Sequence, residues 1–167
     1  MKNTKTAIVA VLLALLAFNA TVAVPVALEL GEDERNEGFT LVAYRSLGVH
    51  PREITIDLFS ADRAAPVDLY RGLFQASAAL EGRRFDRVTL ARQGSAVFVM
   101  DGADFALLGE SFTAGENPIY LIRTLPEKLY LPDGTPAYGT WTGGFLGVLG
   151  AQMRDVNDAA QTWAGGQ

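Results

Sequence analysis

The most regular hydrophobic pattern lies near the end of the chain, where apolar residues recur at alternating intervals of three and four. This stripe consists of Leu146, Leu149, Met153, Val156, Ala160 and Trp163. The spacing is typical of one face of an α-helix, and Thr142 is placed to cap the start of that helix. The pattern therefore predicts a long C-terminal helix that covers the core. Gly147, beside the stripe, is expected to allow close helix packing because it has no Cβ atom.

A second pattern, over residues 54–100, combines strand and helix signals. Polar and apolar side chains alternate over residues 54–60, and a helical stripe that begins at Pro66 ends near Gly82. Two strand-like runs, residues 87–92 and 96–100, flank a short turn that contains Gly94. A helical crossover favours parallel pairing of the first two strands, and the turn makes the last two antiparallel. The sequence thus predicts a β-α-β-β core in an α+β fold, with a mixed sheet covered by helices.

The remaining elements are less distinct. Residues 39–47 have helical spacing followed by Gly48, although their alternation also permits a strand. Residues 103–108 predict a short helix closed by Gly109. Asn117 and Pro118 resemble a helix cap and first turn, so residues 119–125 are either a helix or a strand. The turn residues 132–136 predict a small hairpin.

The N-terminus has the three-part pattern of a secretory signal. Lys2 and Lys5 precede an uncharged apolar run, residues 6–18, and the small polar stretch 19–23 follows. We predict a signal peptide at residues 1–23, with cleavage between Ala23 and Val24. The alternative is an uncut anchor through residues 7–28, because about 20 apolar residues can cross a bilayer.

This division sets the expected domain organisation and location. Residues 24–37 are rich in acids and predict an exposed acidic linker, and residues 38–164 form a single α+β domain. The protein is then exported, either periplasmic or secreted. If the signal is not cut, the protein is instead anchored in the inner membrane.

Composition excludes several kinds of chemistry. The chain of 167 residues has no cysteine and one histidine, which excludes disulfides, thiolate metal sites and any metal site with two histidines. Its net charge is −5, and it becomes −7 without the two N-terminal lysines. Such an acidic protein repels phosphate backbones, so we expect no nucleic-acid partner. We also expect no metal and no cofactor.

The candidate catalytic groups are weak. A nucleophile–histidine–acid triad would have to use His50, and the most nucleophile-like serine, Ser111, lacks the spacing of a nucleophile elbow. Asp101 and Asp104 follow a predicted strand, but a helix start explains them better. The sequence therefore identifies no catalytic residue and favours a protein that is not an enzyme.

Several aromatic and polar residues of the C-terminal half could instead form a pocket with a polar floor. We expect Arg123 and Asn157 to be half-buried near this cluster. The candidate ligand-binding residues are Tyr120, Arg123, Tyr138, Trp141 and Asn157.

These observations favour an exported, non-catalytic module that binds a small ligand or a protein partner. A second hypothesis is a small envelope hydrolase or lyase that uses two carboxylates, in the manner of a cell-wall glycosidase. A third is a membrane-tethered structural partner domain, which follows if the N-terminal segment is retained. In that case the membrane contact is made through this segment only.

Overall fold

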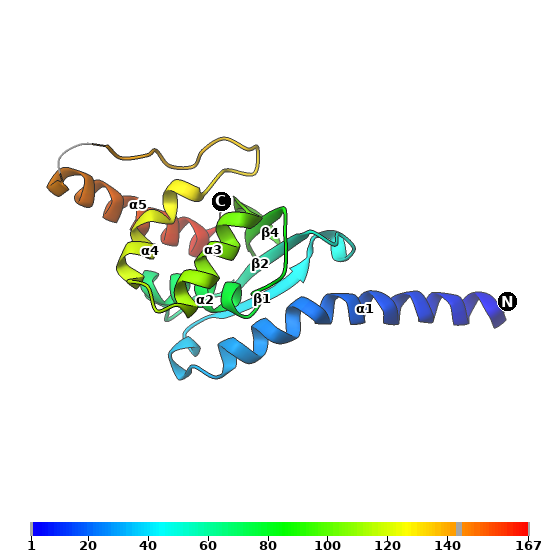
Figure 1. The fold of residues 1–167 in the computed structure, drawn as a ribbon. Helices are drawn as coiled ribbons and strands as arrows, with labels where there is room; N and C mark the ends of the chain where they lie inside the picture. Colours follow the sequence, from blue (N-terminus) through cyan, green and yellow to red (C-terminus); the bar gives the residue numbers. More distant parts are fainter. Residues whose placement is uncertain (1, 143–144, 167) are drawn as a thin grey trace.

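The computed structural model describes residues 2–142 and 145–166, and it has one four-stranded mixed sheet with helices packed around it (Figure 1). The strands are β1 (Thr40–Arg45), β2 (Glu53–Ser60), β3 (Arg87–Arg92) and β4 (Ser95–Asp101). The α-helices are α1 (Lys2–Gly31), α2 (Pro66–Ala78), α3 (Gly102–Thr113), α4 (Pro118–Thr124) and α5 (Phe145–Gly165). Short 3₁₀ turns are η1 (Glu34–Asn36), η2 (Ser46–Gly48) and η3 (Pro126–Lys128). The predicted α+β class is confirmed.

The predicted β-α-β-β core is also confirmed. The strand order is β1-β2-β3-β4, with β2 and β3 parallel and β3 and β4 antiparallel. Gln93 and Gly94 at the β3–β4 turn both have positive φ, 50° and 84°. Two such residues give a turn whose twist matches that of the flanking strands. Local turn chemistry and alternation therefore specify this part of the sheet.

Residues 40–45 form a strand, β1, which pairs antiparallel with β2, so the helix predicted for residues 39–47 is wrong. The alternation of Leu41, Ala43 and Arg45 toward the buried side prevails over the helical spacing. Gly48 has a positive φ of 72°, but it belongs to the β1–β2 turn rather than to a helix end. The sheet thereby gains a fourth strand at its edge.

One face of the sheet forms the core. Ile54, Ile56 and Leu58 of β2 are fully buried, in one cluster with side chains of α2, α3 and α5. On the opposite side of the same strands, Val42 and Phe59 are exposed to solvent. The strands therefore have one covered face and one face that is only partly covered, where Thr55 and Asp57 are nevertheless buried.

The two ambiguous segments after α3 are now resolved. Residues 118–124 form a helix, α4, and the Asn117 side chain accepts a hydrogen bond from the Ile119 N–H, as a helix cap does. The predicted small hairpin is reduced to an antiparallel bridge between Tyr130 and Pro136. Helix α3 continues past Gly109 to Thr113, because this glycine packs tightly against Ser77 of α2.

Helix α1 is longer than expected and continues through Pro25 to Gly31. The stretch 24–37, expected as an exposed linker, therefore forms the last turns of α1 and the turn η1. Val26 and Leu30 are buried against the domain, and so is Asn36. This packing offsets the cost of a proline inside a helix, which is about 3 kcal/mol.

The C-terminal helix covers the sheet, although its apolar stripe differs from the predicted one at its N-terminal end. Val156, Ala160 and Trp163 are buried as predicted, but Met153 is exposed and Leu149 is only partly buried. The first turns of α5 extend past the rest of the domain (Figure 1). A Cβ atom on Gly147 would meet nothing within 4 Å, so the predicted packing role of Gly147 is wrong. Thr142 lies before the helix, and residues 143–144 lie outside the described residues.

This register leads to a direct test. Val156→Ala is expected to lower the free energy of unfolding by about 1.5–3 kcal/mol, because a fully buried apolar side chain is truncated. Met153→Ala, at a predicted stripe position that is exposed, is expected to cost well under about 1 kcal/mol. Urea denaturation of both variants measures the difference. Equal losses would mean that α5 is rotated relative to the register described above.

Candidate functional site

Helix α1 has two halves with different surroundings. The segment from Thr4 to Ala17 projects beyond the domain, and its apolar side chains, such as Leu12 and Leu16, are mostly exposed (Figure 1). The second half packs against β1 and α2, with Val22 fully buried and Val26 nearly so. The region Thr4–Gly31 is long and apolar enough to cross a membrane, since an 18-residue window within it has a mean hydropathy of 2.5, although a signal sequence has the same properties.

The projecting half meets the domain at a polar junction around Asn19 and Arg45. The Asn19 side chain accepts a hydrogen bond from the Arg45 N–H at 2.9 Å and donates one to the Gly48 carbonyl oxygen at 2.8 Å. The Asn19 amide therefore binds one backbone group at the end of β1 and one in the turn η2 that follows. An asparagine in an otherwise apolar helix is thus explained by this contact.

Arg45 completes the junction from the side of the sheet. Its guanidinium donates hydrogen bonds to the Phe18 carbonyl oxygen, the Thr21 hydroxyl and the Pro51 carbonyl oxygen. The guanidinium also lies 4.0 Å from the centre of the Phe18 ring. Burial lowers the pKa of Arg45, and the nearby charge of Arg83 lowers it further. This buried cation is therefore held by neutral groups, most of which belong to α1.

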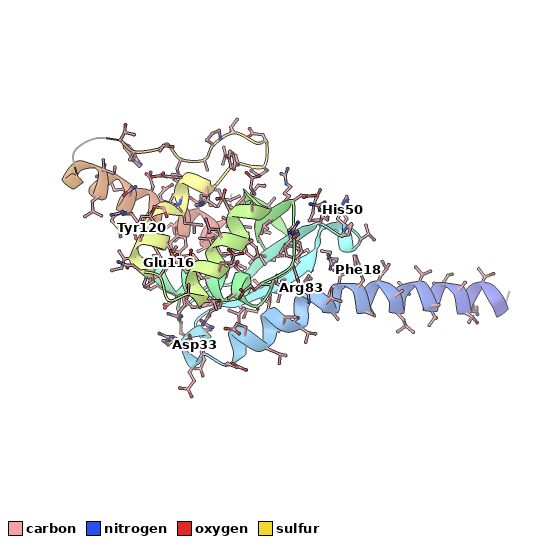
Figure 2. The ribbon with its side chains drawn as sticks, viewed as in Figure 1. Phe18, Asp33, His50, Arg83, Glu116 and Tyr120 are labelled. Atoms are coloured by element: carbon pink, nitrogen blue, oxygen red, sulfur yellow. The ribbon has the colours of Figure 1, made fainter. Side chains whose placement is uncertain are left out.

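A second polar cluster fixes the other end of α1 to the domain. Asp33 accepts hydrogen bonds from Arg35 and Gln75, and Gln75 in turn accepts one from Asn36. The Asn36 side chain also donates to the Leu30 carbonyl oxygen at the end of α1. The hydrogen bond from Arg35 is the main cause that holds the pKa of Asp33 well below its usual range. The label of Asp33 in Figure 2 marks this end of the helix.

The five residues predicted to line a pocket are placed in three groups. Tyr120 and Arg123 lie together on α4, with the guanidinium 5.6 Å from the centre of the Tyr120 ring. Tyr138 and Trp141 donate hydrogen bonds to Asp158 and Asp155 of α5. These two acids therefore connect the preceding loop to the helix.

Asn157 does not join either group. Its side chain is exposed and donates to the Met153 carbonyl oxygen within α5, so the expectation that it is half-buried is wrong. The shift of the buried stripe toward Val156 and Ala159 places Asn157 on the solvent side.

A groove of about 550 Å³ lies between α3 and α4 and includes one of the predicted residues. Its lining includes Leu107, Ser111, Glu116, Tyr120, Glu127 and Lys128. Two of its charged groups are already paired: Lys128 binds Asp104, and Glu127 accepts a hydrogen bond from Gln152. This groove is large enough for a small molecule, but these pairs leave it few free charges with which to bind one.

The remaining chemical candidates lie on different elements of the fold. Asp57 is buried on the otherwise open face of the sheet, where it accepts hydrogen bonds from the Tyr44 hydroxyl and the Gly94 N–H. Burial, followed by the bond to Asp57, raises the pKa of Tyr44 to about 12. His50 is exposed in the β1–β2 turn, whereas Ser111 is buried in α3. Within the described residues, no group of three or more His, Asp or Glu side chains could hold a metal ion.

Sequence reasoning missed the junction at Arg45. Its signal was the alternation of Phe39, Leu41 and Ala43, which places residue 45 on the same buried side of a strand. A charged residue at that position requires polar partners, and Asn19 and Thr21, which the signal pattern had assigned to its polar end, are two of them. The helical interpretation of residues 39–47 concealed this alternation.

Comparison with known proteins gives no match: no family model, curated protein or solved structure is similar to this chain.

Proposed function

We propose that the protein is a membrane-tethered domain whose N-terminal helix is retained and serves as both anchor and part of the fold. The observation that carries this proposal is the division of α1 at Phe18. The apolar side chains of the first half are mostly exposed, whereas the second half supplies buried side chains and the partners of Arg45. Exposed apolar helix surface is costly in water and favourable in a bilayer.

Cleavage between Ala23 and Val24 would remove much more than a leader. It would take away fully buried Val22 and, with Phe18, Asn19 and Thr21, most of the groups that contact Arg45. The Arg45 guanidinium would keep only the Pro51 carbonyl oxygen among these partners. The cut would expose the apolar surface that Val22 covers, and the Arg45 guanidinium would exchange its partners in α1 for water. The folded domain therefore favours an uncut chain.

The charges flanking the helix support one orientation. Lys2 and Lys5 precede the apolar run, and no basic residue occurs again before Arg35. Positive residues favour the cytoplasmic side of an inserted helix. The N-terminus then remains inside, and the acidic domain lies on the outer side of the membrane. In this arrangement the domain still lies outside the cytoplasm, as the sequence predicts, but it stays attached to the membrane instead of being released from it.

The ligand-binding hypothesis has a narrower basis. The groove between α3 and α4 is of suitable size, and the nearby Arg123 has a buried Nε atom with no hydrogen-bond partner. However, Lys128 and Glu127 in the groove are already paired. Small-ligand binding at Tyr120 and Arg123 is therefore the second proposal, and tethering is the first.

The fate of the N-terminus tests the first proposal. We expect the full chain, expressed in a bacterium, to stay in the membrane pellet after alkaline carbonate extraction. Mass spectrometry of that material is expected to show peptides from residues N-terminal to Val24. A soluble exported protein that begins at Val24 would instead establish the cleaved signal peptide and overturn tethering.

A matched control separates retention from poor processing. Replacing Ala23 by a bulky leucine blocks the small-residue requirement for cleavage, so the variant shows how a chain that cannot be cut fractionates. If the native chain and Ala23→Leu both stay in the membrane pellet, the native helix is retained. If only the variant stays in the membrane, the native chain is cut.

A further inference from the structure

The turn between β1 and β2 exposes apolar side chains that the fold does not explain. Leu47 is 85% exposed and Val49 is 51% exposed. Leu47 also has a φ of 52°, a left-handed backbone conformation that is uncommon for a large residue and costs about 1–2 kcal/mol. We call residues 46–50 the β1–β2 tip. Its two apolar side chains face away from the core and contribute little to folding stability.

The tip lies at the point where α1 leaves the domain. The Asn19 side chain donates a hydrogen bond to the Gly48 carbonyl oxygen, so the tip is held against α1 immediately after Phe18. Figure 2 shows the labelled Phe18 and His50 on the same side of the molecule, where the projecting half of the helix begins. Any membrane that surrounds the projecting helix up to Phe18 therefore approaches Leu47 and Val49.

The length of the projecting helix requires such an approach. Thr4 to Ala17 comprises 14 residues, or about 21 Å at 1.5 Å per residue. The hydrocarbon core of a bilayer is about 30 Å thick and requires about 20 helical residues. The free half is therefore about 9 Å short, and the bilayer surface must reach the first contacts between α1 and the domain. Local thinning of the bilayer reduces this difference but draws the domain toward the surface as well.

The charges at this end of the domain permit close approach to lipid headgroups. Strands β2 and β3 both begin here, and α2 and β4 end here. The exposed or half-exposed charges balance, with four arginines (Arg52, Arg83, Arg84 and Arg87) against four acids (Glu53, Glu81, Asp86 and Asp101). The whole chain carries −5. This end therefore lacks the excess of acid that anionic lipids would repel.

We propose that Leu47 and Val49 insert into the interfacial layer of the bilayer beside α1, so that the β1–β2 tip is a second membrane contact. This inference rests on the proposed tethering and names the surface of the domain that the lipid touches. Two apolar side chains next to an anchoring helix gain by leaving water. Together, helix and tip hold the domain at two points.

Single labels can test the contact, because the chain has no cysteine of its own. A polarity-sensitive fluorophore is attached to Leu47→Cys in the full chain, reconstituted in vesicles of phosphatidylcholine with phosphatidylglycerol. Lipids that carry a nitroxide near the headgroup report proximity by quenching. Val67→Cys is the matched control, because Val67 is exposed at the start of α2, at the opposite end of the domain. Leu12→Cys reports the projecting helix itself.

We expect the Leu12 and Leu47 labels to be quenched and shifted to shorter emission wavelengths, and the Val67 label to remain unaffected. Quenching at Leu12 with a Leu47 label that behaves like Val67 would overturn the tip contact and leave tethering intact. A Leu12 label that reports water would overturn tethering, and the tip contact with it. Circular dichroism confirms that each variant is folded, as expected for substitutions at exposed positions.

Discussion

Deleting residues 1–23 is expected to lower the free energy of unfolding of the remaining domain by about 4 kcal/mol or more. Burial of a side chain such as Val22 stabilises a fold by about 1.5–3 kcal/mol. A hydrogen bond to a charged group contributes a net of about 1.5–3 kcal/mol, and Arg45 loses those to the Phe18 carbonyl oxygen and the Thr21 hydroxyl. Because domains are stable by only about 5–15 kcal/mol, the truncated chain is expected to unfold readily.

A shorter deletion provides the control for this experiment. Removing residues 1–13 takes away exposed apolar turns but leaves Phe18, Asn19, Thr21 and Val22 in place. Its free energy of unfolding, measured by urea denaturation in the same mild detergent, is expected to match that of the full chain. If both deletions were equally stable, α1 beyond Ala23 would be sufficient for the fold, and the main structural argument against cleavage would be lost.

Replacing Gly102 by alanine is expected to be the most damaging single substitution, with a loss of about 3 kcal/mol or more. A Cβ atom at this position would lie 1.9 Å from the Phe85 carbonyl oxygen and 2.3 Å from the Phe85 carbonyl carbon. Both are backbone atoms and cannot rotate away, so the start of α3 and the segment before β3 would have to separate. The Gly102 N–H also donates to the Asp86 carbonyl oxygen, and that bond would be strained.

The same substitution at Gly147 distinguishes the steric effect of an added Cβ atom from the helix propensity of alanine. Both glycines lie in helices, but a Cβ atom on Gly147 would meet nothing within 4 Å. Gly147→Ala is therefore expected to be neutral or to stabilise the protein by up to about 1 kcal/mol, since alanine is the better helix former. The midpoints of thermal and urea unfolding are expected to fall for Gly102→Ala and to stay the same or rise for Gly147→Ala. A similar loss at both positions would contradict the exposure of the first turns of α5.

The centre of the sheet was predictable because its signals are local. Alternation in residues 54–60 and the glycine turn at Gly94 are specified within a few residues, and the crossover rule then sets the strand directions. The edge strand β1 was not predictable in the same way, because Phe39 to Leu47 satisfies both a helical and an alternating pattern. Its strand state is decided by pairing with β2, which is a tertiary contact.

The candidate site shows a similar limit. The apolar character of residues 6–18 is evident from composition, but the contact between Asn19 and Arg45 joins residues that are 26 positions apart. The stripe of α5 fails at Met153 because periodicity describes a helix without showing where the domain beneath it ends. Tyr138 and Trp141 were predicted to line a ligand pocket, and in the structure their side chains bind acids of the adjacent helix.

The continuity of α1 has a mechanical consequence. One unbroken helix passes from the projecting segment into the core, with no loop between the two halves, and both ends of its packed half are fastened by polar contacts. There is therefore no flexible joint between the projecting segment and the domain. In the anchored protein, the tilt and azimuth of the helix in the bilayer are transmitted directly to the sheet, so the open face with Val42 and Phe59 keeps a fixed bearing relative to the membrane plane. A change in bilayer thickness that tilts the helix would then rotate the whole domain by the same angle relative to the membrane plane.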